Sequence, residues 1–169
     1  MKEIPLTQGY KAIVDDEDYE ELSKYKWYYS SSGACRDTTG RDGRKKHIHM
    51  SRQIMKAPAH LEVDHKDGNR LDNRRSNLRL CTHAQNLMNQ KPQQRMHSSV
   101  YKGTSWSKVV HKWHSYIKFE QYRYHLGYYE SEAQAAAAYD LAAVHFFGEF
   151  ARLNFPEHIK IYEEHWKKS

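Results

Sequence analysis

The sequence is poor in cysteine and has no long apolar run. Cys35 and Cys81 are the only cysteines among 169 residues, and they form no C-x-x-C pair, which argues against a disulfide framework and a zinc knuckle. No apolar run approaches the roughly 18 residues of a membrane span. The opening MKEIPLTQGYKAIVDDED also lacks the apolar core of a signal peptide. We therefore expect a soluble, intracellular protein without a membrane partner.

The charge is positive and unevenly distributed. The formal net charge is +6, and 13% of the residues are aromatic, as expected for a folded protein that meets a polyanion. Residues 31–102 hold 15 Lys and Arg against 6 acidic residues, whereas residues 103–169 hold 8 of each. The basic middle of the chain is therefore the expected phosphate-facing region.

The N-terminal third predicts strand, helix and strand. β-Branched and aromatic residues favour strands over residues 4–14 and 25–29, with a helix over residues 17–24 capped by Asp16. Residues 30–46 predict a long hairpin tip, followed by a strand at residues 47–49. The tip carries five basic residues that either contact phosphates or belong to a solvated loop: Arg36, Arg41, Arg44, Lys45 and Lys46.

A composition change at residues 90–99 (QKPQQRMHSS) predicts a linker between two domains. Beyond it, three strand-like segments over residues 101–107, 112–119 and 122–128 predict an antiparallel sheet. Residues 131–147 then predict a helix, because Ser131 and Gln134 can form a capping box and Gly148 can end the helix. Its alanines recur at spacings of three and four, which favours close packing on the sheet.

The segment LEVDHKDGNRLDNRRSNLRLCTHAQNLMNQ, residues 61–90, predicts strand, loop, strand and helix. The first strand ends in Asp64 and His65, residues 78–81 form the second strand, and Thr82 can cap a helix that carries Asn86. An Asp-His pair beside a polar loop is by itself an ordinary turn. The ordered pattern as a whole is uncommon, and a neutral histidine within it is a suitable general base for an attacking water.

This segment resembles the HNH endonucleases, whose nuclease unit is a β-hairpin crossed by one helix around a single divalent metal. Asp64-His65, Asn77 in NRRSNL and Asn86 match the three elements of that motif. The resemblance implies that His65 activates the water, that Asn77 holds the catalytic loop, and that Asp64 and Asn86 bind the metal. Hard oxygen ligands indicate Mg²⁺, with Mn²⁺ as the alternative, and His83 remains open as a competing ligand.

Four arginines lie within this unit: Arg70, Arg74, Arg75 and Arg79. They can neutralise phosphates that flank the cut, and their clustering within ten residues beside the motif favours such contacts over the alternative, which is loop solubility.

The segment from Tyr101 to Pro156 is similar to the plant ethylene-response-factor domain (APETALA type). The matching stretches are YKG, KW, HLGYYES, EAQAAAAYD and LNFP. The resemblance implies a three-stranded sheet that lies in the DNA major groove and is backed by one helix. It also implies DNA contacts at four matching positions: Lys102, Trp113, Lys118 and Arg123. At other contact positions of the family this chain has Ser105, Tyr116 and His125, so the bases that it reads are not implied.

We therefore predict an α+β protein with an HNH (ββα-metal) domain at residues 1–95, an ethylene-response-factor-like domain of a small three-stranded sheet and one helix at 99–156, and a tail at 157–169. Its predicted function is metal-dependent, site-specific cleavage of double-stranded DNA. By resemblance to phage and intron-borne homing endonucleases, we expect a monomer that nicks one strand in the cytoplasm of a bacterial host, without an obligate protein partner. A non-cutting transcriptional regulator and an RNA-processing nuclease remain alternatives.

Overall fold

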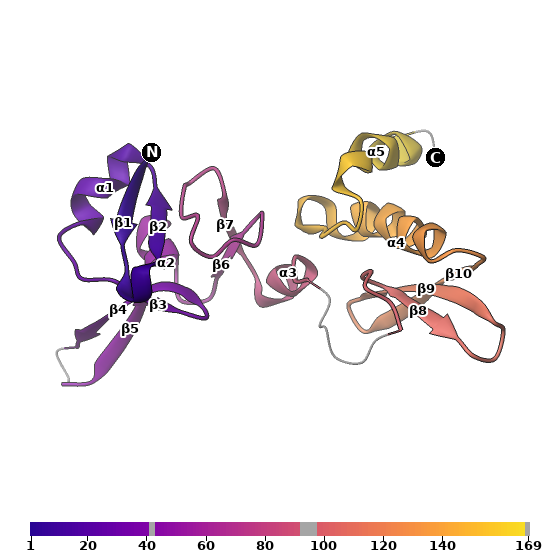
Figure 1. The fold of residues 1–169 in the computed structure, drawn as a ribbon, viewed down its shortest axis with the longest axis horizontal. Coiled ribbons are helices and arrows are strands. Elements are labelled where there is room, and N and C mark those ends of the chain that lie inside the picture. Colours follow the sequence, from indigo (N-terminus) through magenta and orange to yellow (C-terminus); the bar gives the residue numbers. More distant parts are fainter. Residues whose placement is uncertain (41–42, 92–97, 168–169) are drawn as a thin grey trace. The chain divides into compact units, whose positions relative to one another are not determined.

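The computed structural model describes residues 1–40, 43–91 and 98–167, and it confirms a mixed α and β structure (Figure 1). The chain divides into two compact units, Met1–Leu87 and Met88–Ser169. Most of the predicted linker, residues 92–97, lies outside the described residues. None of the described helices is both long enough and apolar enough to span a bilayer.

The first unit begins with a β-hairpin followed by a short helix. Strand β1 (Lys2–Pro5) pairs antiparallel with β2 (Lys11–Val14), and a 3-10 turn, η1 (Thr7–Gly9), joins them. The prediction of one continuous strand over residues 4–14 is wrong, because Gln8 and Gly9 have positive φ angles of 63° and 75° that reverse the chain. Helix α1 (Asp16–Leu22) starts after Asp15, one residue before the predicted cap.

A three-stranded antiparallel sheet follows, in the order β3 (Tyr28–Ser30), β4 (Gly33–Thr39) and β5 (Lys45–His49), and it leads into α2 (Met50–Ile54). The prediction that residues 30–46 form one long hairpin tip is wrong, because strand β4 lies within this segment. Its outer half, from Arg36 to Thr39, is polar on both faces, so no apolar alternation marks the strand. Gly33, at φ +112°, lets this sheet approach the Arg70 backbone, where a Cβ would lie 2.8 Å from the Arg70 carbonyl oxygen.

The predicted motif folds as β6 (Glu62–His65) and β7 (Leu78–Cys81), which form an antiparallel pair, followed by the short helix α3 (His83–Met88). This order agrees with the predicted strand, loop, strand and helix. The pair is attached to the core of the unit by Leu78, which is 3% exposed. That core draws on nearly every element before it and consists of Ile4, Leu6, Ala12, Val14, Leu22, Trp27, Ala34, Met50, Ile54 and Leu78.

The second unit is a three-stranded antiparallel sheet covered by one long helix. Strands β8 (Thr104–Ser107), β9 (Lys112–Phe119) and β10 (Tyr122–Tyr129) pair with β9 in the centre, and α4 (Glu132–Phe147) packs on them (Figure 1). The predicted capping box of Ser131 and Gln134 is present, and Gly148 caps the helix C-terminus. Ile117, Tyr139 and Phe147 lie in the core between the helix and the sheet.

Short helical segments complete the second unit: η2 (Gly148–Phe150), η3 (Pro156–His158) and α5 (Ile159–Lys167). Helix α5 lies in the stretch predicted as a tail, and it packs on α4. Tyr162 is buried, and Trp166 Nε1 donates to the Leu141 carbonyl oxygen at 2.9 Å. These contacts make α5 an integral part of the second unit.

Candidate active site

The pairing of β6 with β7 decides how the predicted site residues are presented. Asp64 lies opposite Arg79, and His65 lies opposite Leu78. Because neighbouring residues of a strand point to opposite faces, Asp64 shares one face with Glu62, and His65 points to the other. Both residues are buried, with Asp64 5% and His65 9% exposed.

His65 is held by an asparagine of the loop that joins the two strands. Its Nε2 lies 3.3 Å from Asn73 Oδ1, and because an amide oxygen only accepts, this contact corresponds to the tautomer with the proton on Nε2 and a basic Nδ1. Burial lowers the pKa of His65, although Asn73 and the nearby carboxylates of Asp64 and Asp67 oppose that effect. The imidazole is therefore neutral at pH 7, the form that a general base requires.

The loop is fixed by the N-terminal hairpin. Ile13 on β2 donates its backbone N–H to the Leu71 carbonyl (2.8 Å) and accepts from the Asn73 N–H (2.8 Å). Asn73 itself is 1% exposed. The sequence analysis did not identify Asn73, because neither the β2 contact nor the burial of this loop follows from local pattern.

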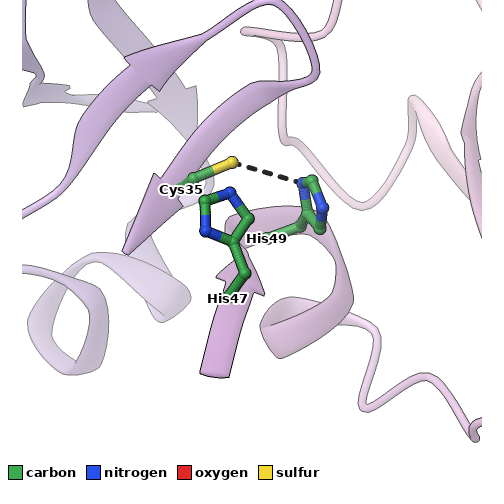
Figure 2. A group of neighbouring side chains, drawn as sticks. All are labelled: Cys35, His47 and His49. Carbon is green, nitrogen blue, oxygen red and sulfur yellow. Dashed lines mark hydrogen bonds between the residues drawn. The ribbon is translucent and has the colours of Figure 1, made fainter. Parts of the chain in front are cut away.

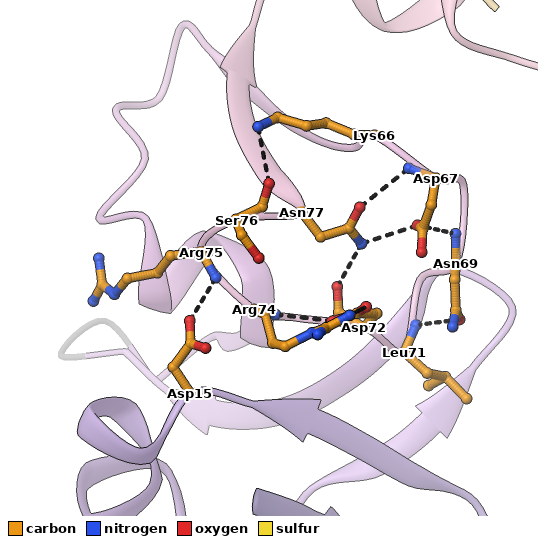
Figure 3. A network of polar contacts seen from close by, with 10 residues as sticks. All are labelled: Asp15, Lys66, Asp67, Asn69, Leu71, Asp72, Arg74, Arg75, Ser76 and Asn77. Carbon is orange, nitrogen blue, oxygen red and sulfur yellow. Dashed lines mark hydrogen bonds and ion pairs between the residues drawn. The ribbon is translucent and has the colours of Figure 1, made fainter. Parts of the chain in front are cut away.

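Asn77 organises the same loop from its other end (Figure 3). Its Nδ2 donates to Asp67 Oδ1 and to the Asp72 carbonyl, both at 2.9 Å, and its Oδ1 accepts from the Asp67 backbone N–H at 3.1 Å. The side chain therefore joins the start of the loop to its middle.

Arg79 neutralises the predicted metal ligand Asp64. Its Nε and Nη2 donate to Asp64 Oδ2 at 2.9 and 2.7 Å, and both side chains are nearly buried. Removal of the arginine would leave the buried carboxylate of Asp64 without this partner. Arg79 therefore lies at the candidate centre rather than on a phosphate-facing loop.

Glu62 connects the predicted ligand on α3 to strand β6, and the sequence analysis missed it. Its carboxylate accepts from Asn86 Nδ2 at 2.6 Å and from His83 Nδ1 at 2.8 Å, and these two contacts lower the pKa of Glu62. Since Glu62 and Asp64 lie on the same face of β6, the contact directs the Asn86 side chain toward that face. The one available signal was the two-residue spacing of Glu62 and Asp64.

The four arginines predicted to face phosphates have partners within the unit. The pairs are Arg70 with the Ser31 carbonyl at 2.7 Å, Arg74 with Asp72 at 2.8 Å, Arg75 with Asp18 at 2.7 Å and Arg79 with Asp64 at 2.7 Å. Arg75 also donates its backbone N–H to Asp15 (Figure 3). Their observed contacts therefore shape the loop and bind it to α1 and to the turn before β4.

Among the basic residues of the predicted tip, Arg36 is a packed residue. Its guanidinium lies 4.0 Å from the Tyr25 ring centroid, and its Nε donates to Gln53 at 3.1 Å. Arg41 lies outside the described residues. Exposed positions at the start of β5 hold the remaining three: Arg44, Lys45 and Lys46.

In the second unit, the strand register separates the predicted DNA contacts. Lys118 and Arg123 face each other across β9 and β10 and are exposed, and the Arg123 guanidinium lies 4.2 Å from the Tyr116 ring centroid. Trp113 alternates with the buried Ser115 and Ile117, so it belongs to the face that α4 covers. Its position does not support a base contact.

Lys102 was also expected to contact DNA, but its ammonium group is bound within the protein. Its ammonium donates to the backbone carbonyls of Met88 and Gln90. Burial lowers the pKa of Lys102 to about 8. Its observed role is to bind the start of this unit to β8, and we exclude it from the candidate DNA surface.

Two comparisons with known proteins both show similarity to HNH endonucleases. A family model described as HNH endonuclease matches residues 44–88, which contain Asp64, His65, Asn77 and Asn86. The chain is 34% identical over 151 residues to an uncharacterized HNH endonuclease of Acanthamoeba polyphaga mimivirus, covering 87% of this chain and 76% of that protein. This match includes parts of both units, because neither unit exceeds 87 residues. No solved structure matches the chain.

Proposed function

Since the chain belongs to the HNH endonuclease family, we propose that it hydrolyses a phosphodiester bond of double-stranded DNA at the unit formed by β6, β7 and α3. The observation that carries this proposal is a neutral, buried histidine on β6 whose Nε2 is bound by Asn73. Asp64 precedes this histidine, and Glu62 directs Asn86 toward the face of Asp64. The proposed base and the proposed oxygen ligands therefore all come from one short hairpin and the helix that follows it.

The donor set fits a divalent metal. Asp64 supplies a carboxylate and Asn86 an amide oxygen, which are hard ligands suited to Mg²⁺, with Mn²⁺ as the alternative. The contact from Glu62 to Asn86 Nδ2 holds the amide group in one orientation, as outer ligands of metal sites do. When bound, the ion supplies Lewis-acid stabilisation of the charge that develops on the phosphate and on the leaving oxygen.

Side chains of the protein would supply the general base and hold it in position. His65 Nδ1 takes a proton from the attacking water, while Asn73 keeps the proton of the ring on Nε2. Asn77 holds the loop that carries Asn73, so it is a positioning residue. Arg79 pairs with the Asp64 carboxylate, and His83 contacts Glu62, so we assign neither Arg79 nor His83 as a ligand.

We propose that the second unit binds duplex DNA through the open face of its sheet, as its resemblance to the ethylene-response-factor domain implies. The register places Lys118, Arg123, Tyr116 and His125 on the face opposite α4. Cationic and aromatic side chains on an open sheet face are suited to phosphate and base contacts. In the first unit, the exposed tip of Arg44, Lys45 and Lys46 provides a second candidate contact.

A nuclease unit joined to a separate recognition unit supports site-specific cleavage of the homing type. One catalytic centre per chain supports nicking by a monomer, because a single centre reaches one strand per binding event. The 34% identity to the mimiviral HNH endonuclease, over parts of both units, is consistent with this two-unit organisation.

The test is cleavage of supercoiled plasmid by the purified chain with Mg²⁺, Mn²⁺ or a chelator. The wild type is expected to produce nicked circles with metal, and His65→Ala is expected to be about 10²- to 10⁴-fold slower. His60→Ala, an exposed histidine of the same unit, serves as the matched control and should cut normally. If neither wild type nor variant cuts but both shift duplex DNA, the chain is a binding protein. If RNA alone is cut, the assignment of the substrate is wrong.

A further inference from the structure

A cysteine and two histidines gather on one face of the β3–β4–β5 sheet, apart from the residues assigned above. His47 and His49 are two residues apart on β5, and the register pairs Cys35 of β4 with His49. The three side chains therefore share a face. Figure 2 shows the Cys35 thiol and both imidazoles turned toward a common point.

The geometry of this cluster is close to that of a transition-metal site. One ligand atom from each residue lies within 4.8 Å of the other two, and Cys35 Sγ lies 3.3 Å from His49 Nδ1. In a tetrahedral zinc site, ligand atoms at Zn–N and Zn–S distances of about 2.0–2.3 Å are about 3.3–3.6 Å apart. Small movements of the side chains are enough to complete the arrangement.

Neighbouring side chains contact two of the three residues, His47 and Cys35. Asp37 Oδ1 accepts from His47 Nδ1 at 2.8 Å, the carboxylate–histidine contact typical of metal sites, and it leaves Nε2 to bind an ion. The Tyr28 hydroxyl lies 2.8 Å from the same Nδ1, 3.1 Å from the same carboxylate oxygen and 3.3 Å from Nε2, so it would have to turn toward Asp37 for an ion to reach Nε2. Ser30 Oγ lies 3.8 Å from Cys35 Sγ and can donate to a thiolate.

We propose that Cys35, His47 and His49 bind one Zn²⁺ ion, separately from the oxygen-ligand centre of Asp64 and Asn86. A thiolate with two imidazoles selects a borderline-soft ion over Mg²⁺. The fourth position is filled by water, because His47 lies at the surface with its side chain 49% exposed. Neutral imidazole is the ligating form. The ion joins β4 to β5 at the base of the basic tip.

The proposal is tested by titrating Co²⁺ into metal-free full-length protein, using an Asp64→Asn/Asn86→Ala background that lacks the oxygen ligands. One equivalent of Co²⁺ is expected to produce a thiolate-to-cobalt absorption band, and Zn²⁺ should displace it. Cys35→Ser should abolish the band, and Cys81→Ser, which removes the other buried cysteine, should retain it. Asp37→Asn should raise the dissociation constant about 10- to 100-fold.

A second set of measurements distinguishes loss of the metal site from loss of the fold. His47→Gln changes an exposed side chain, so circular dichroism should show a native fold with the band lost. Zn²⁺ at 100 times its dissociation constant should raise the folded-to-unfolded ratio of the background protein about 100-fold, and it should not stabilise His47→Gln. Absence of a thiolate band in the background protein, or an unchanged band in Cys35→Ser, would overturn the proposal.

Discussion

Replacement of Glu62 tests the candidate metal centre through a residue that is not itself a proposed ligand. Its carboxylate holds Asn86 Nδ2 at 2.6 Å, and Glu62→Ala would release the amide group. Loss of an outer partner of this kind costs about 10- to 100-fold in metal affinity, or about 1.4–2.7 kcal/mol. The side chain is 39% exposed, so the expected change in the free energy of unfolding is smaller, below about 1 kcal/mol.

The assay is the initial nicking rate as a function of Mg²⁺ concentration. Glu62→Ala should need about 10- to 100-fold more Mg²⁺ for half-maximal rate and should approach the wild-type rate at saturation. His83→Ala is the matched control, since it removes the other partner of the same carboxylate and leaves Asn86 held. A reduced saturating rate with an unchanged Mg²⁺ requirement would refute the reasoning, because Glu62 would then act on the reaction rather than on the ligand.

Three further outcomes are expected. The nicking rate should fall on acidification with a midpoint below pH 6.5, because burial lowers the pKa of His65 and the base stays neutral until that pKa is reached; a midpoint above 6.5 would contradict the assignment. Asn77→Ala should lose three hydrogen bonds at a buried position, which costs about 2–4 kcal/mol in urea unfolding, whereas an unchanged midpoint would show that the loop holds without it. Lys118→Ala and Arg123→Ala should each reduce the salt dependence of duplex binding by about one unit of slope, as measured by fluorescence anisotropy, and an unchanged slope would remove the open sheet face from the DNA surface.

The elements of the motif could be predicted because they are local. Residues 78–81 alternate and end before a capping threonine, and the structure has β7 at Leu78–Cys81. The capping box at Ser131 is likewise a short-range pattern, and it is present. Each of these features depends on residues within four positions of one another.

The partners of side chains could not be predicted, because they depend on contacts between distant segments. Arg75 binds Asp18, 57 residues earlier in the chain, and Asn86 binds Glu62 across 24 residues. A basic loop beside a phosphate-cutting motif suggests DNA contacts, but burial favours ion pairs within the protein wherever acids are near. The polar β4 strand was missed for a related reason, since its pairing with β5 is not encoded in apolar alternation.

The attachment of the β6–β7 loop to β2 determines how much of the chain must be transferred to move this nuclease unit to another protein. The segment matched by the family begins at residue 44, yet the backbone that positions Asn73 is held by Ile13, and the Arg75 N–H is held by Asp15. A chimaera that grafts residues 44–88 alone onto another DNA-binding scaffold would omit this external support. Protein engineers would need to transfer the first hairpin as well, or to build a replacement strand along the loop.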